Sequence, residues 1–231
     1  AEPARTLEPS RQTGIRMSIP TLLDHVVIAG PDLAALVDWF AERTGVVAAP
    51  GGAHPTGTAN ALVALTVDGQ RGPQYIELIG PNPERAEPEL PATFGISTLE
   101  SPSVQAYAVH PADIEATVAA ARAGGYDPGD VSDLSRRTPD GTLLEWRLTR
   151  GESRRLDVPF LIDWGTTPQP GLSDIPSIEL VSLERTEPDP APLQAVLGAF
   201  GLGDGVAEVV AGPESGFRLI LCRADGELVE V

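Results

Sequence analysis

The fold of this chain is decided by the stretch Leu23-Asp24-His25-Val26-Val27-Ile28-Ala29-Gly30-Pro31-Asp32-Leu33. Residues 23–29 are apolar except at Asp24 and His25, which predicts a buried β-strand. Pro31 predicts the start of a helix, because proline is favoured in the first helical turn, and Gly45 predicts its end. Between them an apolar stripe recurs at helical spacing, formed by Leu33, Leu36, Val37 and Phe40.

A second ionisable side chain lies in the middle of an apolar strand further along the chain. Residues 74–79 read Gln-Tyr-Ile-Glu-Leu-Ile, with Glu77 near the centre. Burying an ionisable group is costly unless a partner satisfies it. From the residues alone, either a metal ion or a hydrogen-bond network could satisfy His25 and Glu77.

The strand–helix unit repeats along the chain. In the first copy, the glycine-rich residues 51–60 predict a loop, and residues 61–67 and 74–79 predict strands. The second copy is predicted to have strands at 104–109, 133–137 and 142–148 and a helix opened by Pro111. A fainter third copy is predicted to have strands at 178–183, 206–210, 217–222 and 227–231 and a helical stripe over 193–200.

Composition limits the classes of partner. The chain has 231 residues, of which 42% are hydrophobic, and a formal net charge of −17. This charge argues against nucleic acid or an anionic membrane surface as a partner. No apolar run approaches the roughly 18 residues needed to span a bilayer. The single cysteine, Cys222, excludes an intrachain disulfide and fits a reducing cytoplasm. We therefore expect a cytoplasmic protein.

The chain divides where its composition changes. Residues 1–18 are polar and patternless, and we expect a disordered N-terminal extension there. The two clear copies occupy 19–156. A Pro/Gly-rich connector that packs on the body is expected at 157–176, and the third module at 177–231.

Aligning the two clear copies on their helix-opening prolines pairs their polar residues. His25 and Gln105 each lie six residues before that proline. Glu77 within Tyr-Ile-Glu-Leu corresponds to Glu145 within Leu-Leu-Glu-Trp. If the copies pack about a pseudo-twofold axis, these four side chains can converge in one cavity.

Five short stretches, in order along the chain, carry a family resemblance. They are LDHVVIA (23–29), GGAHPTGTAN (51–60), YIELI (75–79), RTPDGTLLEWRL (137–148) and VPFLIDW (158–164). With the repeated unit, they resemble the vicinal oxygen chelate superfamily, which includes glyoxalase and extradiol dioxygenases, and within it the glyoxalase-like domain family. The resemblance implies an α+β fold in which tandem βαβββ modules form a curved mixed sheet around a cavity. A third, C-terminal βαβββ-like module is expected to follow.

The resemblance also implies a divalent metal ion (Zn, Ni, Mn or Fe), held by the first and last strands of each module. Carried over by position, the ligands are His25, Glu77, Gln105 and Glu145. Glutamine is a poor ligand, and Arg147 shares a strand face with Glu145 and could pair with it. In that case the site reduces to His25, Glu77 and His54, with open coordination positions.

Other polar residues are candidates for catalysis and substrate binding. Glu77, Glu145 and His54 are the candidate catalytic residues, and His54 could also contact the substrate. Asn60, at the entry to a strand, is a candidate hydrogen-bond partner for the substrate. The candidate substrate ligands with a positive charge are Arg136, Arg137 and Arg147, because a guanidinium binds a carboxylate bidentately.

The leading functional hypothesis is a metal-dependent isomerase or lyase of glyoxalase type, acting on a small oxygenated metabolite through a metal-chelated enediolate. One alternative is an Fe(II) dioxygenase that uses His25, His54 and Glu77. Another is a metal-free protein that sequesters a small molecule in an aromatic-lined groove, which an aromatic content of 5% does not favour. Because three modules are an odd number for units that pair, we also expect a homodimer.

Overall fold

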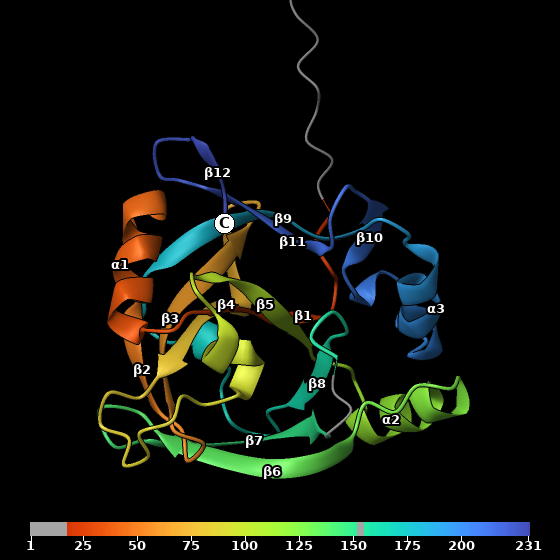
Figure 1. Cartoon of the computed structure of the whole chain (residues 1–231), viewed down its shortest axis with the longest axis horizontal. Coiled ribbons are helices and arrows are strands. Elements are labelled where there is room, and N and C mark those ends of the chain that lie inside the picture. The colour runs from red at the N-terminus through yellow and green to blue at the C-terminus, as the bar shows by residue number, and fades with distance from the viewer. Residues whose placement is uncertain (1–17, 152–154) are drawn as a thin grey trace, which may run out of the picture.

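The computed structural model describes residues 18–151 and 155–231, so the extension predicted for residues 1–18 lies almost entirely outside the described residues. The chain forms one curved mixed sheet, with helices on its outer side (Figure 1). The strands are β1 (Leu23–Ala29), β2 (Ala49–Ala53), β3 (Thr58–Val67), β4 (Gln70–Pro81), β5 (Ser103–Val109), β6 (Asp130–Arg137), β7 (Leu143–Arg150), β8 (Phe160–Asp163), β9 (Ser177–Glu187), β10 (Glu208–Ala211), β11 (Gly216–Cys222) and β12 (Leu228–Glu230). The α-helices are α1 (Leu33–Thr44), α2 (Ile114–Ala123) and α3 (Ala191–Ala199).

The strand order shows paired βαβββ modules. The main path of the sheet runs β12-β11-β9-β3-β4-β1-β5-β8-β7-β6, with β2 added to β3 and β10 added to β9. The first module (β1 to β4) joins the second (β5 to β8) through the antiparallel pair β1–β5. The third module (β9 to β12) joins the first through the parallel pair β3–β9. The predicted α+β fold of tandem modules is thus confirmed.

Each of the first two helices begins at an aspartate. The Asp32 carboxylate accepts a hydrogen bond from the Ala35 amide, and the Asp113 carboxylate accepts one from the Ala116 amide. Such N-caps satisfy amides that have no partner within the helix. The prolines used to align the two copies lie outside these helices, and they lie at different distances from the caps. The proline alignment is therefore one residue out of register.

Two apolar clusters lie on opposite faces of the sheet. The larger cluster fills the space under the helices and includes Leu36, Phe40, Tyr107 and Val109. The smaller cluster lies on the cavity side and includes Val27, Ala106, Ala108 and Phe160. Successive strand residues point to opposite faces, so β5 presents Ala106 and Ala108 to the cavity and Tyr107 to the helices.

Two stretches differ from the sequence predictions. Residues 51–60, predicted as a loop, lie largely in the β2–β3 hairpin, in which Gly52 pairs with Asn60. The predicted connector 157–176 contains β8, which pairs with β5 and β7 and completes the second module. A strand of only four residues between prolines and glycines carries too short a pattern to be recognised.

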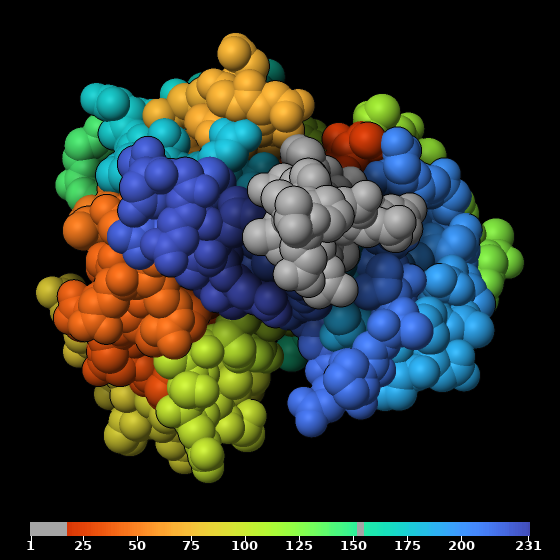
Figure 2. All heavy atoms as spheres, turned by 90° about the horizontal axis from the view of Figure 1, so that it is seen from above, coloured from red at the N-terminus to blue at the C-terminus, as the bar shows by residue number. Residues whose placement is uncertain are grey.

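The third module packs on the rest of the same chain. Leu180, Leu183 and Leu219 belong to the larger apolar cluster. The Ala207 amide donates a hydrogen bond to the Tyr107 hydroxyl on β5. Seen from above, the C-terminal strands (blue) lie against the region of α1 (orange), where Arg223 donates to the carbonyl of Arg43 (Figure 2).

Candidate active site

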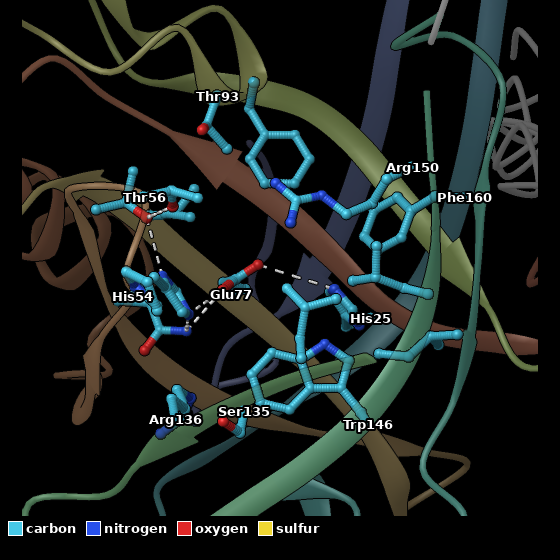
Figure 3. Close-up of a pocket in the computed structure, with 18 of the residues that line it drawn as sticks. His25, His54, Thr56, Glu77, Thr93, Ser135, Arg136, Trp146, Arg150 and Phe160 are labelled. Atoms are coloured by element: carbon cyan, nitrogen blue, oxygen red, sulfur yellow. Dashed lines mark hydrogen bonds and ion pairs between the residues drawn. The ribbon is translucent and has the colours of Figure 1, made fainter. Parts of the chain in front are cut away.

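A pocket of about 370 Å³ opens on the concave side of the sheet. Its two histidines and Glu77 come from the first module, whereas β6, β7 and β8 of the second module form much of its wall (Figure 3). The polar residues from the first module are His25, His54, Thr56, Thr58, Asn60 and Glu77. The second module contributes Arg136, Trp146, Leu148, Arg150, Phe160 and Ile162, among others. A cavity of this size accommodates a small metabolite.

His25 is held by a buried carboxylate. The Nδ1–H of His25 donates to Asp24 Oδ1 at 2.7 Å. The other carboxylate oxygen of Asp24 accepts from Trp164 Nε1 at 3.1 Å and from Gln169 Nε2 at 2.7 Å. The His25 ring stacks on Tyr75 with 4.6 Å between ring centroids. These contacts fix the tautomer, so that the Nε2 lone pair of His25 faces the pocket.

Glu77 lies between two imidazoles on the pocket floor. Its Oε2 is 3.8 Å from Nε2 of His25, and its Oε1 is 3.9 Å from Nε2 of His54. Both distances are too long for direct hydrogen bonds. The carboxylate is instead fixed by Asn60, whose Nδ2 donates to Oε1 at 2.6 Å. The cross-strand pair Leu62–Glu77 places β3 beside β4 here.

His54 is neutral in this arrangement. The Asn60 amide nitrogen can only donate, and it lies 3.4 Å from His54 Nε2, so that nitrogen accepts. The Nδ1–H of His54 therefore donates to the Thr58 hydroxyl at 2.9 Å. Burial lowers the pKa of His54 below its ordinary value, and Arg136 lowers it further, although Glu77 acts in the opposite direction.

The three predicted arginines are placed differently. Arg136 is buried in the pocket wall, where its Nη1 donates to the Gly51 carbonyl at 2.5 Å. Arg137 is exposed and its Nη1 donates to the Gly141 carbonyl, because the next residue on a strand faces the other side. Arg147 pairs with Glu115 and Asp163 away from the pocket, and it does not pair with Glu145.

Gln105 and Glu145 do not reach the pocket. Gln105 lies on the opposite face of β5 from Ala106, and its side chain donates to the Ser103 hydroxyl. Glu145 is exposed, since on β7 it is the alternate residues Trp146, Leu148 and Arg150 that line the pocket. The expected four-residue site around His25 and Glu77 is therefore not assembled.

The helix caps identify different equivalents in the second module. His25 lies seven residues before the N-cap Asp32, and Ala106 lies seven residues before the N-cap Asp113. The sheet register agrees, because His25 pairs with Ala108 and Val27 pairs with Ala106, as a twofold relation between the modules requires.

The last strands of the two modules, β4 and β8, are related by the same twofold relation. Val27 pairs in parallel with Glu77, and its counterpart Ala108 pairs in parallel with Phe160. Phe160 thus takes the place that corresponds to Glu77, and Ala106 the place that corresponds to His25. Neither side chain carries a donor atom for a metal.

The divalent metal predicted from the sequence does not fit this donor set. Within residues 18–151 and 155–231, no group of three or more His, Cys, Asp or Glu side chains is arranged to hold a metal ion. His54 offers its Nε2 lone pair to Asn60, and the same amide occupies Oε1 of Glu77. Of the donor atoms of His25, His54 and Glu77, this leaves His25 Nε2 and Glu77 Oε2, which is fewer than the three protein ligands of an ordinary catalytic zinc site.

Sequence reasoning missed several residues of the pocket. Asp24 precedes His25 in the strand, and its presence in an apolar run was the signal for a buried polar network. Arg150 follows from the alternation of β7 once its face toward the cavity is known. Phe160 lies in the segment predicted as a connector.

Comparison with known proteins places the chain in a family. The family model described as "Glyoxalase-like domain" matches residues 23–200. No curated protein matches. The crystal structure of a hypothetical protein from Staphylococcus aureus is 13% identical, with a TM-score of 0.61, over 90% of this chain and 97% of that one.

Two enzymes are also similar. Methylmalonyl-CoA epimerase from Mycobacterium tuberculosis is 20% identical over 65% of this chain and 91% of its own, with a TM-score of 0.38. A variant of the Streptomyces coelicolor epimerase is 19% identical over 67% of this chain and 100% of its own, with a TM-score of 0.42. The family match covers most of the chain, so the protein belongs to the glyoxalase-like domain family.

Proposed function

We propose that the protein is an enzyme that moves a proton on a small oxygenated substrate, as an isomerase or a lyase does, with Glu77 as the base. The observation that supports this is the placement of the Glu77 carboxylate on the pocket floor. Asn60 fixes its Oε1, while Oε2 faces His25. A carboxylate held in this way can take a proton from a carbon next to a carbonyl group.

Residues of this chain can both remove the proton from the substrate and return it. Glu77 takes the proton, and the electron pair of the C–H bond moves toward the carbonyl oxygen. Return of the proton to a neighbouring atom gives an isomer, and expulsion of a group from the next carbon gives a lyase product. His25 is the second acid–base group, since its Nε2 faces the pocket and Asp24 fixes its orientation.

A second candidate function is binding without turnover. Five aromatic side chains line the pocket, namely Tyr75, Phe94, Trp146, Phe160 and Trp164. An aromatic wall of this kind favours the sequestration of a small molecule. It predicts tight binding that is insensitive to replacement of Glu77 by a residue of the same shape.

The test is exchange of a substrate C–H proton with solvent. The full chain is incubated in D₂O with a panel of small 2-oxo acids, 2-hydroxy acids and α-hydroxy ketones, and deuterium incorporation is followed by NMR. We expect Glu77→Gln to slow exchange by about 10²-fold or more, the usual contribution of a general base. Glu145→Gln, an exposed carboxylate outside the pocket, is the matched control and should leave the rate unchanged. Equal exchange rates for the wild type and Glu77→Gln would contradict the proposal, and so would bound compounds that never exchange.

A further inference from the structure

Arg136 is a buried cation without a carboxylate partner. Its side chain lies in the pocket wall and has 6% exposure, yet no Asp or Glu among residues 18–151 and 155–231 lies within ion-pair distance of it. Other arginines of this acidic chain do have such partners, including Arg122, Arg147, Arg185 and Arg218. Burying a charge without a counter-ion is costly. A counter-ion supplied by a ligand would remove that cost.

The guanidinium has a free edge. Its Nη1 donates to the Gly51 carbonyl at 2.5 Å. In the described part of the chain, Nε and Nη2 have no hydrogen-bond partner, and neither is among the fully enclosed polar atoms that lack one. These two nitrogens therefore keep access to the pocket. The edge formed by Nε and Nη2 is a fork that matches the two oxygens of a carboxylate.

The hairpin β2–β3 is shaped to hold this arginine. A Cβ at Gly52 would lie 3.1 Å from Nη1 of Arg136 and 2.6 Å from the Arg137 carbonyl oxygen. Gly52 also has a φ of +148°, which side chains rarely adopt. The glycine pair Gly51–Gly52 thus supplies both the anchoring carbonyl and the space for the guanidinium.

The anchored arginine lies beside the proposed acid–base group. Glu77 and Tyr75 are close enough for electrostatic interaction with Arg136. A second guanidinium, from Arg150, also points into the pocket, and Figure 3 shows it on a different side of Glu77 from Arg136. The pocket lining holds two arginines, Arg136 and Arg150, and two carboxylates, Glu77 and Asp133. The pocket is therefore balanced in charge within a chain that has 33 acidic and 16 basic side chains. The two guanidinium groups would offset repulsion between Glu77 and an anionic substrate.

We propose that the substrate carries a carboxylate, which the Nε–Nη2 edge of Arg136 binds bidentately, so that a nearby C–H bond lies next to Glu77. The substrate class is therefore a small 2-hydroxy acid, in which Glu77 takes the hydrogen of C2, or a small 2-oxo acid, in which it takes a hydrogen of C3, next to the carbonyl group. Its remaining, less polar part faces the aromatic wall at Trp146 and Phe160. This inference rests on the proposed function, because it uses Glu77 as the reacting group.

The experiment measures binding separately from reaction. Calorimetric titrations at fixed ionic strength compare pyruvate, lactate and 2-oxobutyrate with pyruvamide and lactamide, which lack the negative charge, and with inorganic phosphate. We expect at least one carboxylate to bind about tenfold or more tightly than its amide. Arg136→Gln should abolish this preference, and Arg136→Lys should restore it only in part, because an ammonium cannot form the fork. Arg137→Gln, the exposed neighbour, is the matched control and should bind like the wild type.

Each outcome bears on the inference. Equal affinity for acids and amides overturns it, as does full affinity in a folded Arg136→Gln variant or the absence of binding by every carboxylate. Binding of phosphate alone overturns the carboxylate class. The folded state of each variant is checked by circular dichroism, and Arg136→Lys serves if Arg136→Gln fails to fold.

Glu77→Gln should still bind the carboxylate. Binding without any proton exchange in the wild type therefore contradicts the proposed function and leaves the carboxylate inference standing.

Discussion

At the scale of single residues, the pocket depends on Asp24, which is fully buried and binds three side chains. Replacement by asparagine keeps the size but turns one acceptor oxygen into a donor that faces other donors. We expect Asp24→Asn to lower the free energy of unfolding by about 2–3 kcal/mol, in line with lost hydrogen bonds to a charged group. Urea denaturation measures this change. Asp113→Asn is the control, because asparagine caps a helix as well as aspartate, and a loss of similar size there would show that the buried network is not the cause.

His54 gives the stability a pH dependence. Burial holds its pKa below the ordinary value of 6.5 in the folded protein. The unfolded chain therefore takes up a proton first as the pH falls, and His54 costs stability between pH 6.5 and its lower folded pKa. The slope it contributes is at most about 1.4 kcal/mol per pH unit. Urea denaturation from pH 7.5 to 5 should show a steeper loss in the wild type than in His54→Gln. Parallel curves would contradict this.

At the scale of elements, the two modules differ at the positions where a shared metal site would need matching ligands. Installing donors in the second module, as Ala106→His with Phe160→Glu, should create stoichiometric zinc binding together with His25 and Glu77. We expect zinc to raise the melting temperature of this double variant and not that of the wild type. Metal content after desalting measures the stoichiometry.

The control for this experiment fills the same space without good zinc ligands. Ala106→Gln with Phe160→Gln should not bind zinc stoichiometrically, because an amide is a poor zinc ligand and the donors are then still those of His25 and Glu77. Stoichiometric zinc in the wild type, lost on His25→Ala, would show that the donor set of the first module is sufficient.

The strands and helices also show which parts of the fold and of the site can be predicted from the sequence. Strand β1, the position of α1 and the polar residues His25, His54, Asn60 and Glu77 could be predicted, because their apolar context marks them. The equivalent residues in the second module could not be predicted, because the two copies are aligned on their prolines, whereas an aspartate cap sets the start of α1 and of α2. The proline alignment therefore selects Gln105 in place of Ala106. Neighbouring residues of a strand point to opposite faces, so Gln105 lies on the wrong face of β5.

At the scale of the whole molecule, the third module is part of one folded unit. Its leucines share a cluster with the first two modules, so we expect a single unfolding transition. Trp39, Trp146 and Trp164 all precede residue 177, and their fluorescence reports only the first two modules and the segment that follows them. Urea unfolding followed by this fluorescence and by circular dichroism should give one midpoint. An earlier transition by circular dichroism would show that residues 177–231 unfold separately.

Two further properties of the whole molecule concern membranes and the oligomeric state. In the described part of the chain, no helix combines the length and apolar character needed to cross a bilayer. The homodimer stays a prediction, and its argument from an odd module is weaker now that β9 pairs with β3 of the same chain. Light scattering on the purified 24.2 kDa chain distinguishes a monomer from a dimer.

The pocket draws its acid–base residues from one module and much of its wall from the other. After an internal duplication, such a division lets each copy change under its own selection. Substitutions on β6, β7 and β8 can alter which molecule is accepted, while the residues proposed to move the proton stay untouched on β1, β3 and β4. Relatives of this chain are then expected to differ in substrate before they differ in chemistry.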